Sequence, residues 1–213
     1  MSAVAPYATV LNDNGLTGSH VALRPLRAGD GPALFAALRD PVVWTWLTVP
    51  APPNEATMSR YVDEVLSEGE AGARFCWVVE AEATVAGWTS YGDISLQDER
   101  IEIGWTAYGP AWQRTAVNTE TKLLLLRHAF EVLGYHRVAL KTDARNERSQ
   151  RAIERIGAVR EGVLRGHVRR PDGTKRDTVY YSILSDEWPA VRASLLARLA
   201  SRPGPVQAPG EPR

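Results

Sequence analysis

The stretch WQRTAVNTETKLLLLRHAFEVLGYHRVALKTDARNERSQRAIERIG, residues 112–157, decides the fold. Its loop Gln113-Arg114-Thr115-Ala116-Val117-Asn118 opens an amphipathic helix, and a strand is predicted over 137–143. Asn146-Glu147-Arg148-Ser149 then opens a second helix, which is predicted to end at Gly157. This order places two helix N-termini, whose first N–H groups lack partners within the helix, beside neighbouring strand ends. Such an arrangement suits an anionic, phosphate-bearing cofactor.

Three β-like runs precede this stretch, at 74–80, 84–91 and 100–107, and short polar links between them predict an antiparallel meander. Before them come a strand over 21–26, a helix that starts around Pro32 and a second helix over about 54–66, with Gly69 beyond its end. After the stretch, the runs 159–169 and 176–184 form a predicted hairpin, and a last helix follows Ser185. Strands before, between and after helices predict a mixed α/β sheet with helices on both faces.

The domain prediction is a short lead-in over 1–19, one domain over 20–200 and a disordered tail over 201–213 that is rich in proline and glycine. The 25 basic and 25 acidic side chains balance, so nothing suggests a nucleic acid as partner. A single cysteine, Cys76, cannot form an internal disulfide, fits a reducing compartment and is expected to be buried. With no apolar run of ~18–20 residues and no signal-peptide pattern, we expect no membrane partner and a cytoplasmic location.

Eight short runs are informative together, although no single run is specific by itself. They are Val21-Ala-Leu-Arg-Pro-Leu26, Ile101-Glu-Ile-Gly-Trp105, Asn118-Thr-Glu120, His128-Ala-Phe130, Asn146-Glu-Arg-Ser149, Ile156-Gly-Ala158, Glu161-Gly-Val-Leu-Arg165 and Tyr181-Ser-Ile-Leu184. In this order and at these spacings they are similar to the GCN5-related N-acetyltransferase (GNAT) superfamily, and within it to the RimJ/RimL-like group. The resemblance extends over about 18–198.

The resemblance implies the GNAT fold, a mostly antiparallel sheet of about seven strands in which two central parallel strands splay apart. It also implies acetyl-CoA as co-substrate. The pantetheine arm is then expected along Gly104, Trp105 and Thr106 of a bulged strand, with an amide near Trp105 facing the thioester oxygen. Such a fixed donor stabilises the oxyanion that forms during acyl transfer.

In that family the pyrophosphate loop follows the pattern Q/R-x-x-G-x-G/A, which maps onto Gln113, Ala116 and Asn118. We expect the cofactor's phosphates at Gln113, Arg114, Thr115, Ala116, Val117 and Asn118. Only the first position matches, because alanine and asparagine stand where the family has small residues or glycine. Arg114 could add a charge-assisted contact. The other interpretation is a plain helix-start loop in which Asn118 is a helix cap.

The acceptor must attack as a neutral amine, and a protein α-amine with a pKa near 8 needs only a modest base. By resemblance that base is Glu102, which period-two alternation places on the opposite face from Ile101 and Ile103. The alternative for Glu102 is a solvated or salt-bridged strand residue. Glu120 is the rival carboxylate, although a position in a helix's first turn also suits the helix dipole.

Asn146 and Ser149 lie three residues apart at a helix start. The resemblance implies that Ser149 protonates the departing thiolate and that Asn146 contacts the pantetheine; simple helix capping by Asn146 is the compatible alternative. Four tryptophans are candidates either for the acceptor site or for the core: Trp44, Trp46, Trp88 and Trp105. The four histidines lack metal-like spacing, and no metal is predicted.

The leading hypothesis is therefore an acetyl-CoA-dependent N-acetyltransferase in which the amine attacks the thioester directly. The acceptor is a protein N-terminal amine or a small-molecule amine, and the sequence leaves that choice open. A CoA-binding regulatory module with little turnover is the rival, motivated by the altered loop, and a structural protein without cofactor is the third. The C-terminal hairpin and helix could support a homodimer.

Overall fold

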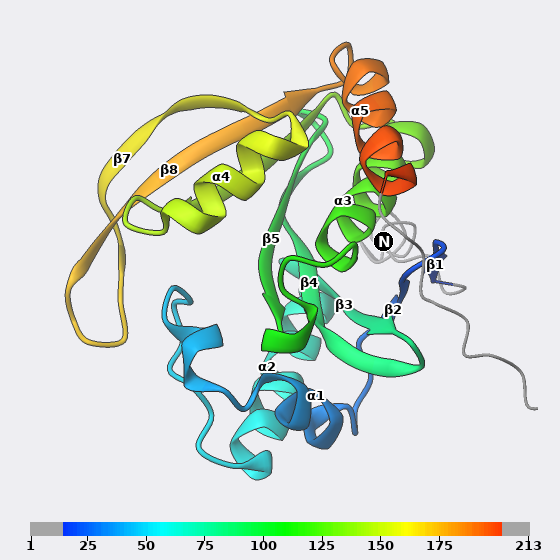
Figure 1. Ribbon diagram of the computed structural model, residues 1–213. Coiled ribbons are helices and arrows are strands. Elements are labelled where there is room, and N and C mark those ends of the chain that lie inside the picture. Colours follow the sequence, from blue (N-terminus) through cyan, green and yellow to red (C-terminus); the bar gives the residue numbers. More distant parts are fainter. Residues whose placement is uncertain (1–14, 202–213) are drawn as a thin grey trace, which may run out of the picture.

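The computed structural model describes residues 15–201, which form one eight-stranded sheet with helices on both faces (Figure 1). The strand order is β1-β2-β3-β4-β5-β6-β8-β7. The strands are β1 (Leu16–Thr17), β2 (Ala22–Pro25), β3 (Arg74–Ala81), β4 (Thr84–Ser95), β5 (Arg100–Tyr108), β6 (Arg137–Asp143), β7 (Val159–Arg169) and β8 (Lys175–Leu184). All neighbours are antiparallel except β5 and β6, which are parallel.

The helices join the strands in the order that the sequence predicts, and short 3₁₀ turns η1 (Pro41–Trp44) and η2 (Pro110–Trp112) accompany them. A π-helical turn, η3 (His128–Val132), directly extends the third helix, and Gly134 follows it with a φ of +71°. The α-helices are α1 (Gly31–Leu38), α2 (Glu55–Glu70), α3 (Val117–Arg127), α4 (Glu147–Ile156) and α5 (Trp188–Ala200).

Alternating side chains of β3 show why both faces of the sheet are covered. Cys76 and Val78 are buried against α1 and α2, whereas Phe75, Trp77 and Val79 are buried in the larger core beneath α3, α4 and α5. A strand that is apolar on both faces must be covered twice, and the two layers of helices do this. The mixed sheet between helices is thus confirmed.

Three details differ from the sequence predictions. The sheet has eight strands rather than about seven, because Leu16 and Thr17, assigned to the lead-in, pair with Leu23 and Ala22. Helix α2 ends at Glu70, so Gly69 lies inside it rather than beyond its end. The predicted tail lies outside the described residues except for Ser201. No helix within residues 15–201 is long and apolar enough to cross a membrane.

Candidate active site

The parallel strands β5 and β6 pair at only three positions and then separate. Arg100, Ile101 and Glu102 pair with residues 137–139, and no pairing follows beyond Glu102. The rest of β5 therefore has a hydrogen-bonded neighbour on the β4 side alone, and its backbone groups on the other side face open space. The splay that the resemblance implied is present.

A bulge in β5 lies just beyond the point of separation. Ser90 pairs with Gly104 and Trp88 with Ala107, so Trp105 and Thr106 together oppose one residue of β4. Trp105 has a φ of +49°, which is rare for a non-glycine residue. Its side chain packs over Gly92 and beneath the guanidinium of Arg74, whose Cζ lies 4.9 Å from the ring centroid. The bulge thus turns the backbone of β5 toward the gap.

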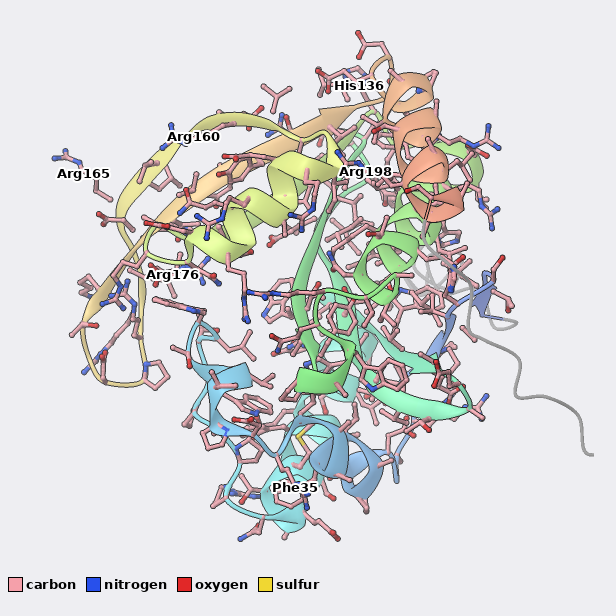
Figure 2. All side chains as sticks on the ribbon, in the orientation of Figure 1. Phe35, His136, Arg160, Arg165, Arg176 and Arg198 are labelled. Atoms are coloured by element: carbon pink, nitrogen blue, oxygen red, sulfur yellow. The ribbon has the colours of Figure 1, made fainter. Side chains whose placement is uncertain are left out.

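A cleft of about 630 Å³ occupies this gap, and Arg176, labelled in Figure 2, is one of its lining residues. One wall is β5 from Glu102 to Tyr108 and the other is Leu140, Lys141 and Thr142 of β6. Residues at the starts of α3 and α4 and residues after α1, among them Val43, Trp46 and Leu47, complete the lining.

Glu102 is buried at the bottom of this cleft, with 4% of its surface exposed. Its carboxylate forms an ion pair with the ammonium of Lys141 on β6, at 2.5 Å. Burial raises the pKa of Glu102 above its ordinary value although Lys141 opposes the shift. Gly104 lies on the same side, where a Cβ atom would come within 2.8 Å of Glu102 Oε1. Because Gly104 has no side chain, the Glu102 carboxylate can occupy this position without a steric clash.

A second lysine, which the sequence analysis did not single out, also lines the cleft. Lys122 extends from α3, and its Nζ donates to Thr106 Oγ1 at 2.8 Å, while Thr106 bonds to Thr89 at the same distance. Burial lowers the pKa of Lys122 to about 7, although the nearby Glu102 carboxylate opposes this shift. The sequence signal for this residue was its position directly before four leucines of the helix, because lysine is rarely buried unless it has a partner.

The loop before α3 borders the cleft through four of its six predicted contact residues. Gln113, Arg114, Thr115 and Asn118 line it, whereas Val117 is buried in the core and Ala116 is not among the lining residues. The side chain of Gln113 donates to Tyr108 O at 3.3 Å and accepts from Arg148 of α4 at 2.6 Å. This pair connects the two helix starts across the end of the cleft.

Asn118 is not the cap of α3, contrary to one sequence interpretation. The N-cap position is Ala116, which makes no side-chain cap, and Asn118 lies one residue inside the helix. Thr115 Oγ1 instead accepts from the amide of Val117 at 3.2 Å. Ala116 has a φ of −69°, a conformation that any residue adopts, so glycine is not required there for backbone reasons.

Helix α4 begins differently, because Asn146 caps it. Its Oδ1 accepts from the amide of Ser149 at 3.1 Å, and both residues line the cleft. Capping therefore accounts for the buried Asn146 side chain.

Glu120 lies in the first turn of α3, a position that also suits the helix dipole, and its contacts are structural. Its carboxylate accepts from the amides of Ser19, His20 and Val21 at 2.5–2.8 Å, and it does not line the cleft. The carboxylate therefore fastens the segment before β2 to α3.

The four tryptophans divide between the two alternatives. Trp44 and Trp88 are buried in the core beneath α1 and α2, whereas Trp46 and Trp105 line the cleft. Trp46 lies 5.5 Å below the Cζ of Arg145, near the start of α4.

The charge of the cleft lining is strongly one-sided. Glu102 is its only carboxylate among the described residues. Seven cationic side chains line it, namely Arg114, Lys122, Lys141, Arg148, Arg151, Arg155 and Arg176. The balanced charge of the whole chain conceals this local excess, which attracts a polyanion. In residues 15–201 no three His, Cys, Asp or Glu side chains are grouped as metal ligands would be.

Comparison with known proteins agrees with this geometry. Residues 20–159 match the family described as Acetyltransferase (GNAT) domain. The N-acetyltransferase YdaF of Bacillus subtilis strain 168 is 32% identical over 108 residues, which cover 50% of this chain and 57% of YdaF. YoaA of the same strain, an uncharacterized N-acetyltransferase, is 25% identical over 76% of this chain and 92% of its own length. The chain thus spans little more than half of the first of these relatives.

Solved structures extend the likeness over most of the fold. A GCN5-related N-acetyltransferase from Brucella melitensis has a TM-score of 0.82 and 32% identity, over 89% of this chain and 87% of that one. A proposed acetyltransferase from T. thermophilus has a TM-score of 0.80 and 43% identity, over 87% of this chain and 96% of that one. The chain belongs to the GNAT family of acetyltransferases.

Proposed function

We propose that this protein transfers an acetyl group from acetyl-CoA to a primary amine, by direct attack of the amine in a ternary complex. The observation that carries the proposal is the cleft between the splayed strands, whose seven cationic side chains face one carboxylate. CoA bears several phosphate charges on a long, narrow carrier, and a basic slot with exposed backbone groups suits such a ligand.

The residues present fit acetyl-CoA at both ends of the cleft. The backbone of Gly104, Trp105 and Thr106 lacks a strand partner on the cleft side, so it is available to the pantetheine amides. Gln113, Arg114 and the first turn of α3 face the other end, where the pyrophosphate is expected. A protein of this fold from Mycobacterium smegmatis, RimJ, was solved in complex with CoA-disulfide.

In the proposed reaction the amine nitrogen bonds to the thioester carbonyl carbon, and the carbon–sulfur bond then breaks. Glu102 takes the proton that the amine loses, directly or through a water molecule, and its raised pKa favours this role. Ser149 at the start of α4 passes a proton to the departing thiolate and takes up another from water, so its hydroxyl is restored. An amide of the bulge near Trp105 stabilises the oxyanion, and Asn146 orients the carrier.

The acceptor that we propose is a primary amine of a protein N-terminus or of a small molecule. A strongly cationic acceptor fits poorly, because Glu102 is the only carboxylate among the cleft-lining residues that the structure describes. The description of YdaF as a ribosomal N-acetyltransferase supports a protein N-terminus, whose single amine is partly neutral at pH 7.

The test is incubation with acetyl-CoA and matched peptides that carry either a free or a blocked N-terminal amine, together with a panel of small amines. Release of free thiol and a mass gain on an unblocked amine are expected. If CoA raises the melting temperature but no amine releases thiol, the protein is the CoA-binding module instead. The absence of both glycines from the phosphate loop favours that rival, although the φ of −69° at Ala116 shows that the loop backbone does not need one there.

A further inference from the structure

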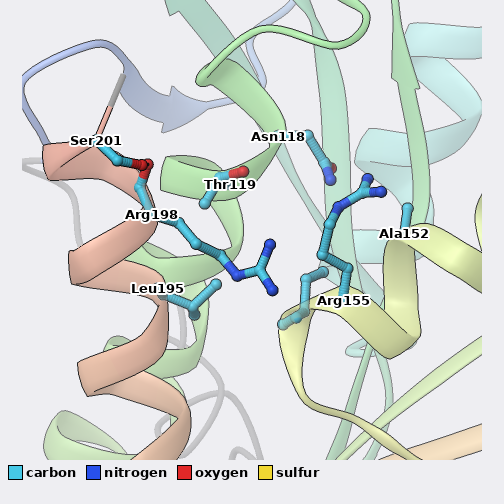
Figure 3. A pocket seen from close by; sticks show the side chains of 8 residues that line it. Asn118, Thr119, Ala152, Arg155, Leu195, Arg198 and Ser201 are labelled. Atoms are coloured by element: carbon cyan, nitrogen blue, oxygen red, sulfur yellow. The ribbon is translucent and has the colours of Figure 1, made fainter. Parts of the chain in front are cut away.

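A second, smaller cavity lies beside the cleft, between the start of α3, the end of α4 and the end of α5 (Figure 3). Its volume is about 130 Å³. Because a cavity holds one water from about 10–15 Å³ upward, this one admits a group of the size of a phosphate. Its lining residues are Asn118, Thr119, Ala152, Arg155, Ile156, Leu195, Arg198 and Ser201.

Two guanidinium groups from different helices converge on this cavity. Arg155 of α4 and Arg198 of α5 reach into the space between the helices from opposite sides (Figure 3). Within residues 15–201 neither of them forms an ion pair, whereas Arg151 and Arg192 on the same two helices pair with Glu147 and Glu131. Two like charges that face one cavity without a carboxylate repel each other, so an anion between them would relieve the repulsion.

The start of α3, which forms the third wall of the cavity, also favours an anion. Asn118 and Thr119 belong to the first turn of α3, which has no side-chain cap at Ala116. Thr115 Oγ1 accepts from the amide of Val117, but the first amides of a helix lack partners within the helix and favour negative charge. The converging arginines and the start of α3 therefore select the same kind of ligand.

The small cavity is continuous with the cleft, because five residues line both: Asn118, Thr119, Ala152, Arg155 and Ile156. A ligand in the cleft with its pyrophosphate at the start of α3 would need only a short extension to reach Arg198. In CoA that extension exists, since the ribose next to the pyrophosphate carries a phosphate monoester at its 3′ position.

We propose that Arg155 and Arg198 form a phosphate-monoester site that binds the ribose 3′-phosphate of the CoA carrier. The inference rests on the proposed function, since it assumes CoA in the cleft. A phosphate monoester has a second pKa near 6 and is mostly a dianion at pH 7. Guanidinium groups match its oxygens with paired, charge-assisted hydrogen bonds. Arg198 of α5 would thus let the protein distinguish CoA from dephospho-CoA, which lacks the 3′-phosphate.

The test measures dissociation constants of CoA and of dephospho-CoA by calorimetry, for the wild type, Arg198→Gln and Arg155→Gln. We expect the wild type to prefer CoA by about 10-fold or more, and each substitution to reduce that preference toward one. Arg198 lies outside the cleft, so Arg198→Gln should change the affinity for dephospho-CoA little. Arg192→Gln is the matched control, because it removes the same charge from α5 outside both cavities and should keep the preference.

Two results would overturn the proposal. One is equal affinity of the wild type for the two carriers. The other is a preference that survives in Arg198→Gln and Arg155→Gln. Inorganic phosphate that binds the wild type without competing with CoA would also overturn it, by showing an independent anion site. Failure of the proposed function has another signature, because then neither acetyl-CoA nor its dephospho form would release thiol with any amine.

Discussion

The floor and the rim of the cleft differ in almost every physical property. The floor consists of Glu102, Lys122, Lys141 and Thr106. Glu102 and Lys122 are buried, Glu102 forms an ion pair with Lys141 at 2.5 Å, and Lys122 donates to Thr106 at 2.8 Å. The rim consists of arginines from the loop before α3 and from α4, and Arg114, Arg148 and Arg155 are exposed to solvent. Burial shifts pKa values on the floor, whereas rim charges stay in contact with water.

This difference teaches which part of the reaction each region can serve. Burial raises the pKa of Glu102 and lowers that of Lys122 to about 7, so the floor is suited to the proton transfer of the chemical step. Exposed arginines keep their charge at any physiological pH, so the rim is suited to attracting and holding an anion. Substitutions on the floor should therefore change kcat, and substitutions on the rim should change the affinity for CoA.

The largest effect is expected for Glu102→Gln, which keeps the shape of the side chain but removes the base. We expect kcat to fall by roughly 10²-fold or more, while the dissociation constant of CoA changes little. In the wild type, kcat/KM should fall on acidification through a pKa above the ordinary glutamate value, because burial raises the pKa of Glu102. Steady-state kinetics across pH 5–9 together with CoA calorimetry check both points.

The substitution also leaves Lys141 without its counter-ion, so a control is needed. Lys141→Met alone keeps the carboxylate and should retain far more activity than Glu102→Gln, and the double variant should be as slow as Glu102→Gln. If Glu102→Gln turned over at the wild-type rate, the carboxylate would be only a structural partner of Lys141.

The second prediction concerns stability on the floor. Lys122→Met should raise the free energy of unfolding by on the order of 2 kcal/mol at pH 6.5, because it removes a charge that burial disfavours. For a chain of this length that corresponds to roughly 4–8 °C in melting temperature.

The pH dependence of that gain follows from the lowered pKa of Lys122. Between about 7 and the ordinary lysine value, the unfolded chain binds the proton and the folded chain does not, so wild-type stability rises with pH. The advantage of Lys122→Met is therefore full below pH 7 and shrinks toward pH 9.5. Thermal melts of both proteins at pH 6.5 and 9.5 measure it, and an advantage independent of pH would mean that the lysine is not buried as a charge.

Sequence reasoning located the floor and the rim but not how they are connected. The strand alternation around Glu102 and the two helix starts could be predicted, because they depend on local periodicity and on capping residues. Lys122, Arg198 and Arg176 reach their cavities only through the packing of distant elements, which no local pattern encodes. The hydrogen bonds of Glu120 could not be predicted for the same reason, since its partners at 19–21 lie about 100 residues away.

The third prediction tests the boundary between the two regions. Ser149 lies at the rim, at the start of α4, but its proposed role is chemical. Ser149→Ala should lower kcat by only ~10-fold, because a thiol with a pKa near 8.5 is already a fair leaving group. Asn146 still caps the backbone amide of residue 149, so the melting temperature should not change.

Single-turnover rates separate this loss from an effect on binding. Ser149→Thr keeps the hydroxyl and should restore most of the rate. A change confined to the affinity for CoA would assign Ser149 to the rim in function as well as in position.

The smallest effect is expected for Ala116→Gly, which restores the glycine that the family pattern has at this position of the phosphate loop. Glycine is valuable where φ is positive or where a Cβ atom would obstruct a ligand, but Ala116 has a φ of −69° and does not line the cleft. At an N-cap, glycine is at least as favourable as alanine, so the helix start should not suffer either. We therefore expect the dissociation constant of CoA to stay within about twofold of wild type by calorimetry. A marked gain in affinity would show that the alanine obstructs the phosphates. The affinity of the rim for CoA would then depend on the backbone of the loop more than on the arginines.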